Sequence, residues 1–270
     1  MAAKASDLGA AKAELDALRT FVLAVLAGAF IALGAMFATV VTADAADVPF
    51  GVIRLAGGVV FSLGLVLVVV AGAELFTGNN LIVMAWADRR ITPGRLLRNW
   101  GIVYAGNLVG ALATALLVFA ARQYEFGDGA VGLNALAIAN TKASLGWGQA
   151  VALGVLCNAL VCLGVWLSYA ARSVTDKVLA VSLPITAFVA AGFEHSVANM
   201  YFLPIGLLVK GTSLADGGDY ANLSWSNALF DNLVPVTIGN IFGGAVMVGL
   251  VYWLVYRRPA GRPPSDRPTA

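Results

Sequence analysis

Two short stretches of the sequence place ionisable side chains at the ends of long apolar segments. Residues 71–79 read AGAELFTGN and residues 191–199 read AGFEHSVAN, so that Ala, Gly, Glu and Asn recur 120 residues apart. The second stretch contains His195, the only histidine of the chain. A buried carboxylate needs partners, and a neutral imidazole can donate or accept a proton near physiological pH. The pattern therefore indicates a site for proton transfer or for a small anion.

The composition places both stretches in a membrane protein. Of the 270 residues, 60% are hydrophobic and 12% are charged, and the mean hydropathy is +0.83, whereas soluble domains contain about 25% charged residues. A helix needs about 20 mostly apolar residues to cross a bilayer. Six regions are long enough: 20–42, 51–87, 99–121, 149–171, 178–209 and 232–256. We predict an all-α protein with one channel-like domain of six transmembrane helices, residues 20–256.

Two of these regions, 51–87 and 178–209, are longer than one span requires, and each contains one of the repeated stretches. Thr, Gly, Asn, Ser and His are poor helix formers, so we expect both helices to break there. Broken backbone in a membrane must be buried in protein or line a cavity. The N-terminus of a half-helix favours negative charge. The breaks therefore predict a site for a small, oxygen-rich anion or its neutral acid.

A second pair of motifs extends the repeat. GNLVGA at residues 106–111 and GNIFGGA at residues 239–245 lie in the third and sixth regions. Two matches in the same order indicate duplication of a three-helix unit, and because three is odd the second copy crosses the membrane in the opposite direction. Inverted repeats place transport sites near the mid-membrane, between discontinuous helices. A symmetric fold without transport would show the same repeat, so the pattern predicts architecture before function.

The charges predict the topology and the nature of the two ends. Four of the 17 Lys and Arg residues (Arg54, Arg122, Lys142 and Lys210) lie on the outer side if both termini are cytoplasmic, which leaves 13 inside, as the positive-inside rule favours. The net charge of +2 follows from this topology and indicates no nucleic-acid partner. We expect residues 1–19 to form a cytoplasmic amphipathic helix with Leu8, Ala11, Leu15 and Leu18 on one face. The Pro-rich tail 257–270 is expected to be disordered.

Several motifs together resemble the formate/nitrite transporter family: FSLGL, AELFTGN, GNLVGA, GFEHSVANM and PVTIGN, within a similarity that runs from Phe21 to Tyr256. GRLLRNW, YAARSVTDK and DNLVPVTIGN are most similar to the bacterial formate channels. The resemblance implies an aquaporin-like homopentamer in the bacterial inner membrane, in which each protomer is a pore. It implies formate as substrate, with nitrite, lactate, acetate and hydrosulfide as alternatives within the family.

The resemblance also assigns candidate residues. It implies a substrate pathway formed by His195, Thr77, Asn240 and Lys142. Each has a simpler alternative: a lone buried His can serve packing, Thr77 and Asn240 can satisfy helix breaks, and a loop lysine such as Lys142 is usually just solvated. The pore constrictions that it implies, which by spacing alone are ordinary core, are Phe61, Leu65, Leu75, Phe76, Val161 and Phe188.

The remaining polar residues are expected to be structural. We predict that Glu74 and Glu194 hold the broken loops by accepting backbone N–H groups, and that Asn158 and Asn199 satisfy the helix breaks. Cys157 and Cys162 lie five residues apart, on different sides of a helix, so no disulfide, metal site or cofactor is indicated. An enzyme with His195 as general base would need a second titratable partner. A membrane scaffold or sensor without solute flux is the other alternative.

Overall fold

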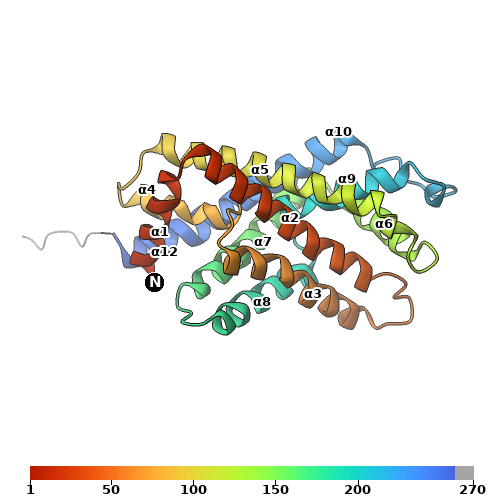
Figure 1. Cartoon of the computed structure of the whole chain (residues 1–270), viewed down its shortest axis with the longest axis horizontal. Coiled ribbons are helices and arrows are strands. Elements are labelled where there is room, and N and C mark those ends of the chain that lie inside the picture. Colours follow the sequence, from red (N-terminus) through yellow and green to blue (C-terminus); the bar gives the residue numbers. More distant parts are fainter. Residues whose placement is uncertain (259–270) are drawn as a thin grey trace, which may run out of the picture.

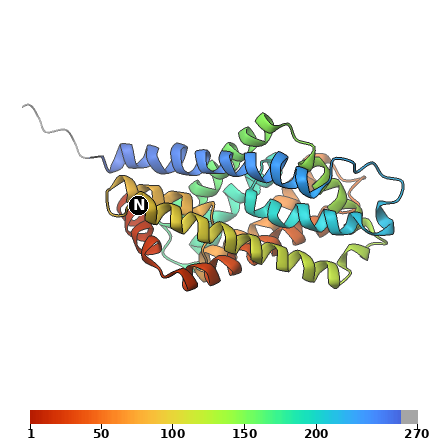
Figure 2. The ribbon, with the colours of Figure 1, turned by 90° about the horizontal axis from the view of Figure 1, so that it is seen from above.

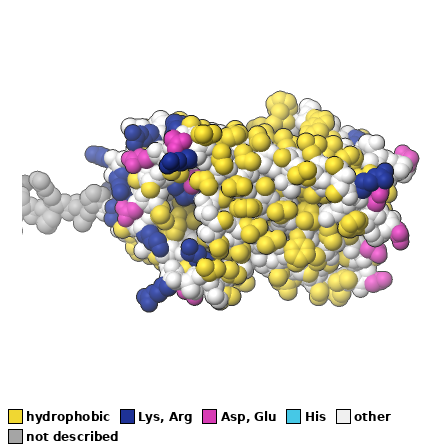
Figure 3. All heavy atoms as spheres, viewed as in Figure 1, with side chains coloured by type: hydrophobic (Ala, Val, Ile, Leu, Met, Phe, Trp, Pro, Cys, Tyr) yellow, Lys and Arg dark blue, Asp and Glu magenta, His cyan; other side chains and the backbone are white. Residues whose placement is uncertain are grey.

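The structure, a computed structural model, describes residues 1–258, so the tail predicted to be disordered lies outside the described residues except for Arg257 and Arg258. Six helices in this part are long and apolar enough to cross a membrane. They are α2 (Ala17–Val41), α3 (Phe50–Ala71), α5 (Pro93–Ala120), α7 (Trp147–Ser168), α8 (Val174–Ala191) and the continuous helix Trp225–Tyr256. Apolar side chains cover the middle of the molecule, and charged side chains gather at its two ends (Figure 3).

The two helices predicted to be discontinuous are broken at the repeated stretches. α3 and α8 end at Gly72 and Gly192, whose left-handed φ values of +74° and +77° are accessible mainly to glycine. After the first break the chain continues into η1 (Gly78–Ile82) and α4 (Val83–Ala87). After the second it continues into α9 (Ser196–Lys210). The poor helix formers of the two motifs thus occupy the break or the first turn after it.

Equivalent helices of the two halves pack in the same way. α2 packs on α5, α7 packs on α11 (Val234–Ile241) and η5 (Phe242–Leu250), and α3 packs on α8 between the halves. A Cβ on Gly110 would lie 2.0 Å from the carbonyl oxygen of Val25, and one on Gly243 would lie 2.1 Å from that of Val155. Such contacts need bare backbone, which explains these glycines. The packing agrees with the predicted duplication.

The last membrane helix is irregular along its length. It comprises α10 (Trp225–Asn227), the π-helical segment η4 (Ala228–Leu233), α11, the π-helical η5 and α12 (Val251–Tyr256). Pro235 in the first turn of α11 lacks the N–H needed for a regular helical hydrogen bond, which suits a π-helical turn before it. Asn232 lies within η4, and Asn240 lies just before η5.

The N-terminal helix differs from the prediction. α1 spans Ala2–Glu14 instead of residues 1–19, because the side chain of Asp16 caps the next helix by accepting a hydrogen bond from the Arg19 N–H at 3.0 Å. Its buried residues are Ala5, Ser6, Gly9, Ala10 and Ala13. The predicted leucine-bearing face is therefore wrong: small residues pack α1 against η1 and α4, while Leu18 is 73% exposed in α2.

The two ends of the described chain share one end of the molecule, where α1 and α12 approach each other (Figures 1 and 2). The opposite end carries α6 (Ala130–Ala143) and the short segments η2 (Gln123–Glu125) and η3 (Ser213–Ala215). The six long helices run between these two ends. Any pathway through the protomer therefore has one mouth beside the termini and one beside α6.

Candidate functional site

His195 and Thr77 form the buried contact that joins the two broken stretches. Thr77 Oγ1 lies 2.8 Å from His195 Nε2, and the two residues are 0% and 2% exposed. His195 also caps α9, because its Nδ1 accepts the backbone N–H of Ala198 at 3.0 Å. In a neutral imidazole one nitrogen accepts and the other carries the proton. The backbone therefore fixes the proton on Nε2, which donates to Thr77.

Two cavities approach this pair from the two ends of the molecule. The terminal cavity, about 340 Å³ beside α1, is lined by residues that include Lys12, Leu65, Glu74 and Leu75. The opposite cavity, about 610 Å³ beside α6, reaches His195 itself and is also lined by Phe61, Lys142, Phe188 and Glu194. Leu65 and Phe61 lie one helical turn apart on α3, each facing a different cavity. The turn of α3 from Phe61 to Leu65 therefore separates the two cavities.

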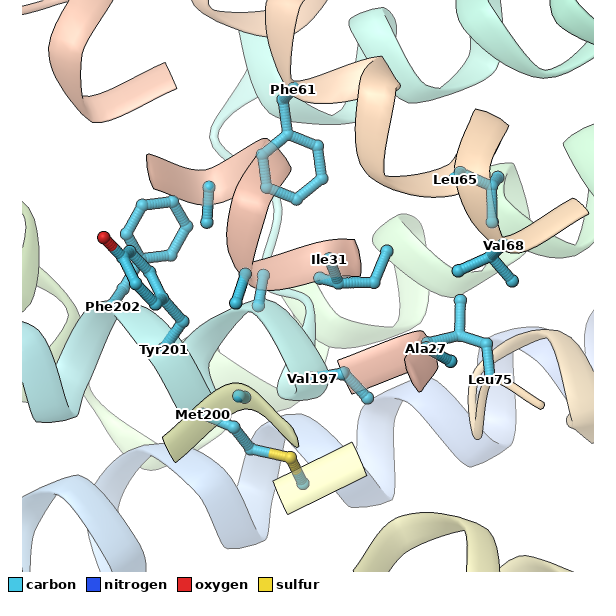
Figure 4. Packing of buried hydrophobic residues seen from close by; sticks show 14 of the residues in the cluster. Ala27, Ile31, Phe61, Leu65, Val68, Leu75, Val197, Met200, Tyr201 and Phe202 are labelled. Carbon is cyan, nitrogen blue, oxygen red and sulfur yellow. The ribbon is translucent and has the colours of Figure 1, made fainter. Parts of the chain in front are cut away.

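Aromatic rings close the inner end of the opposite cavity. The Phe61 and Phe188 rings meet edge to face with centroids 5.7 Å apart, Phe61 stacks on Phe202 at 6.4 Å, and Phe188 stacks on His195 at 5.8 Å. Leu65, Val68 and Leu75 lie together farther along the same apolar cluster (Figure 4). The structure thus places apolar side chains on both sides of the histidine.

The other two predicted constriction residues line neither of these cavities. Phe76 is buried with its ring against Trp100 and Tyr104 of α5, at centroid distances of 6.2 and 4.9 Å. Val161 is buried in α7 within the same apolar cluster. Both residues belong to the apolar cluster that also contains Phe61, Leu65 and Phe188, and their place in a constriction stays a prediction.

Three side chains surround the carboxylate of Glu194 and form with it a group of four residues, called here the second cluster. Glu194 Oε1 accepts from Lys142 Nζ at 2.7 Å, and its Oε2 accepts from Asn199 and Asn232 at 2.6 and 3.2 Å. Asn232 also donates to the backbone oxygen of Lys142 at 2.9 Å. The expectation that backbone N–H groups hold Glu194 is wrong, because side-chain amides and an ammonium group do so. Lys142 likewise lies near the end of α6 and not in a loop.

The first cluster repeats this arrangement beside α1. Glu74 Oε1 accepts from Lys12 Nζ at 2.7 Å, and Oε2 accepts from Asn79 at 2.6 Å. Asn99 donates to the backbone oxygen of Lys12 at 3.3 Å. Glu74 thus also binds side chains in place of the expected backbone groups. Asn79 and Asn199 hold the same position in the two clusters. Asn199 donates to the side chains of Glu194 and Asn232 and not to backbone groups of the break, so the role predicted for it is wrong.

Asn240 satisfies backbone groups at the second break, which is the simpler of its two predicted roles, and its place in a substrate pathway stays a prediction. It makes no direct hydrogen bond to His195: it donates to the backbone oxygens of Gly154 and Glu194 at 2.8 and 2.9 Å and accepts from the Ser196 N–H at 2.9 Å. Asn107 does the same in the first half, donating to Ala24 and Glu74 and accepting from the Phe76 N–H. Both asparagines therefore fix a broken loop and position the central pair indirectly.

Asn158 connects the two halves from α7. Its amide donates to the backbone oxygens of Thr77 at 3.3 Å and Asn240 at 2.7 Å, and to the side-chain oxygen of Asn80 at 3.1 Å. It thereby satisfies the Thr77 carbonyl at the first break, as predicted, and also the Asn240 carbonyl just before the π-helical η5. The backbone around the central pair is thus held by amide side chains from three helices.

Sequence reasoning missed four residues of this framework: Lys12, Asn99, Asn107 and Asn232. A signal was present, because Lys12 and Lys142 lie 130 residues apart, and the pairs Asn99/Asn232 and Asn107/Asn240 each lie 133 residues apart. Comparing the two halves beyond the conspicuous motifs would have found them.

Comparison with known proteins decides the family. Residues 1–254 match the family described as formate/nitrite transporter. The chain belongs to the formate/nitrite transporter family. A formate channel of Escherichia coli (strain K12), FocA, is 46% identical over 266 residues, covering 96% of this chain and 93% of the relative. FocA of Haemophilus influenzae is 41% identical, covering 88% and 87%.

Solved structures of the formate/nitrite transporter family have the same fold. A pentameric formate channel with formate bound aligns with a TM-score of 0.82 at 45% identity, covering 89% of this chain and 97% of that one. An ion channel of the same family aligns with a TM-score of 0.80 at 29% identity, covering 94% and 98%. The family is one of transporters and channels, so the enzyme alternative is excluded.

Proposed function

We propose that this protein is a formate channel whose substrate crosses the centre as formic acid. The observation that carries the proposal is the buried His195–Thr77 pair, which lies between two cavities that each contain a Lys–Glu ion pair. Near relatives with the same fold are named formate channels, which supports formate as the substrate. Nitrite, lactate, acetate and hydrosulfide are the alternatives within the family.

The apolar rings around His195 favour a neutral permeant. Moving a bare carboxylate into an apolar environment costs many kcal/mol, whereas a neutral acid pays far less. Leaving water also raises the pKa of the substrate's own carboxyl group, since burial disfavours the charged form. The anion collects at a charged mouth, takes up a proton as it loses water, and crosses between Phe61 and Leu65 without charge.

The central pair positions the substrate more readily than it supplies the proton. Nε2–H of His195 donates to Thr77, so the Thr77 hydroxyl can donate its own hydrogen to a substrate oxygen. An imidazolium would break the bond from the Ala198 N–H and place positive charge at a helix N-terminus, where the helix dipole opposes it. We infer that His195 stays neutral and that the proton arrives through water.

Assembly and orientation are also proposed from the relatives. The related formate channel of known structure is pentameric, and we infer a homopentamer of five separate pores in a bacterial inner membrane. Basic residues are concentrated at the end that carries the two termini (Figure 3), which supports a cytoplasmic location for both. The terminal cavity is then the cytoplasmic mouth.

Uptake into proteoliposomes that contain a pH-sensitive dye tests the proposal. We expect formate to acidify the lumen faster than nitrite, lactate, acetate or hydrosulfide at equal concentration. His195→Asn removes the imidazole and the Nε2 donor, and we expect at least a tenfold loss of flux. Faster uptake of another anion would leave the fold and family unchanged but would show that formate is not the preferred substrate. No flux of any anion would favour a scaffold or sensor.

A further inference from the structure

The opposite cavity contains a positive charge that its lysine does not explain. The Lys142 ammonium lies 2.7 Å from Glu194 Oε1, with side-chain exposures of 14% and 5%, so this pair contributes little net charge to the cavity. Among residues 1–258, the charged groups that line the cavity are Lys142, Glu194 and Arg54. Two positive charges and one negative charge leave a net charge of +1, and Arg54 is its source.

Arg54 is held at the cavity wall by uncharged partners. It lies near the start of α3, and its guanidinium closes the end of α8: Nε donates to the backbone oxygen of Ala190 at 2.9 Å and Nη2 donates to that of Val189 at 2.7 Å. No carboxylate within residues 1–258 lies within ion-pair distance of it. These bonds fix the position of the guanidinium and leave its full charge in place.

The other mouth has a related arrangement. Lys177 near the start of α8 lines the terminal cavity together with Val68, Val69 and Gly72 at the end of α3. The lysine of the first cluster, Lys12, is again paired with a glutamate. Arg54 near the start of α3 thus lies beside the end of α8, and Lys177 near the start of α8 lies beside the end of α3. This recurrence argues against a chance placement of Arg54.

We propose that Arg54, more than Lys142, sets the attraction of the opposite mouth for monovalent carboxylates. The inference rests on the proposed formate transport and names the charge that draws the anion to the site. A cavity with apolar walls concentrates the field of such a charge and raises the local concentration of anions. In water one unit charge about 4 Å away is worth a factor of roughly five in local concentration.

The test is formate permeability in proteoliposomes at two ionic strengths, with potassium sulfate as the added salt. At about 0.01 M the screening length is about 30 Å, and at about 1 M it is about 3 Å. We expect Arg54→Gln to lower permeability about three- to fivefold at the lower ionic strength, and the difference from wild type to disappear at the higher one. Arg54→Lys keeps the charge and should stay within about twofold of wild type.

Two further variants separate charge from helix capping. Gln149 also lines the opposite cavity and is exposed, so Gln149→Lys should restore the permeability of Arg54→Gln without restoring its bonds to α8. Gln149→Lys alone should raise wild-type permeability at low salt, which gives a reading even if Arg54→Gln does not assemble. Arg122→Gln is the control, because Arg122 pairs with Glu125 on the surface and lines neither cavity.

Three results would overturn the proposal. The first is a permeability of Arg54→Gln at low salt equal to that of wild type. The second is a loss of permeability in Arg54→Gln that is equal at both salt concentrations and is not rescued by Arg54→Lys or by Gln149→Lys. The third is no gain in permeability from Gln149→Lys alone. Absence of formate flux in wild type would instead refute the proposed function itself.

Discussion

At the scale of single residues, the backbone of α9 decides what His195 can do. Nδ1 accepts the Ala198 N–H, so the single N–H of the ring lies on Nε2 and points at Thr77. The motif predicted that the histidine would be buried at a helix break, because the surrounding residues are poor helix formers. The tautomer could not be predicted, since it depends on a hydrogen bond three residues along the chain that exists only once His195 caps the helix.

Thr77 is the direct test of this geometry. Thr77→Val keeps the shape of the side chain and removes the acceptor of Nε2–H, and leaving a buried donor unpaired costs about 1–3 kcal/mol. We expect at least a tenfold loss of formate flux and a lower pentamer melting temperature. Thr77→Ser keeps the hydroxyl and should retain most of both. Equal behaviour of the two variants would argue against a role for the hydroxyl.

The Lys142–Glu194 pair makes a prediction about stability. Lys142→Met leaves the nearly buried Glu194 carboxylate without its cation, and breaking such a pair costs about 3–5 kcal/mol. The double variant Lys142→Met/Glu194→Gln removes both charges, so we expect it to be more stable than Lys142→Met alone. Thermal unfolding of the three proteins in detergent measures this. A double variant no more stable than Lys142→Met would show that the unpaired carboxylate has little effect on stability, and would contradict this prediction.

At the scale of elements, the sequence predicted well what depends on local chemistry. Six spans, two breaks and the duplication follow from hydropathy, poor helix formers and repeated motifs. The face of α1 was mispredicted because the helix packs through Ala, Ser and Gly on η1 and α4, and such small residues give no hydrophobic pattern. Lys142 was placed in a loop because the helix Ala130–Ala143, at 14 residues, is too short to resemble a transmembrane span.

The close packing of α2 on α5 predicts which glycines of α5 can be replaced by alanine. Gly110→Ala would place a methyl group 2.0 Å from the Val25 carbonyl oxygen, which forces α2 and α5 apart. We expect a loss of about 1–3 kcal/mol, the usual cost of overpacking, and less assembled pentamer. Gly101→Ala in the same helix has open space around it and should be neutral or slightly stabilising. Size-exclusion profiles and thermal unfolding compare the two.

At the scale of the whole molecule, one carboxylate ties the end of the last helix to the body of the channel. Asp88, in the turn after α4, accepts from Trp253 Nε1 at 2.7 Å and from Arg257 Nε at 3.0 Å. Burial raises the pKa of Asp88, but the hydrogen bonds that it accepts and the charge of Arg257 lower it further, so its pKa lies below the ordinary value. The ionised Asp88 therefore stabilises the fold at pH values above the ordinary pKa of an aspartate. This stabilisation is lost as the pH falls through the lowered pKa of Asp88.

Trypsin reports on this tie. Arg258, Arg262 and Arg267 each precede a proline, which trypsin does not cleave, so the susceptible bond near the end of the chain follows Arg257. At neutral pH Asp88→Asn should speed cleavage there about tenfold, as expected for loss of hydrogen bonds to a charged group worth about 1.5–3 kcal/mol. Asp7→Asn, which weakens the contact of Arg90 with α1, serves as a control. Equal cleavage of wild type and Asp88→Asn would show that Asp88 does not hold α12.

The central claim is that the substrate crosses the apolar centre without charge. Radiolabelled formate and an internal pH dye, followed in the same proteoliposomes under voltage clamp by a potassium gradient, measure it most directly. One proton per formate, with uptake independent of voltage, is the predicted result. Formate uptake that depends on voltage and leaves the internal pH unchanged would mean that the bare anion passes His195, and would contradict this account.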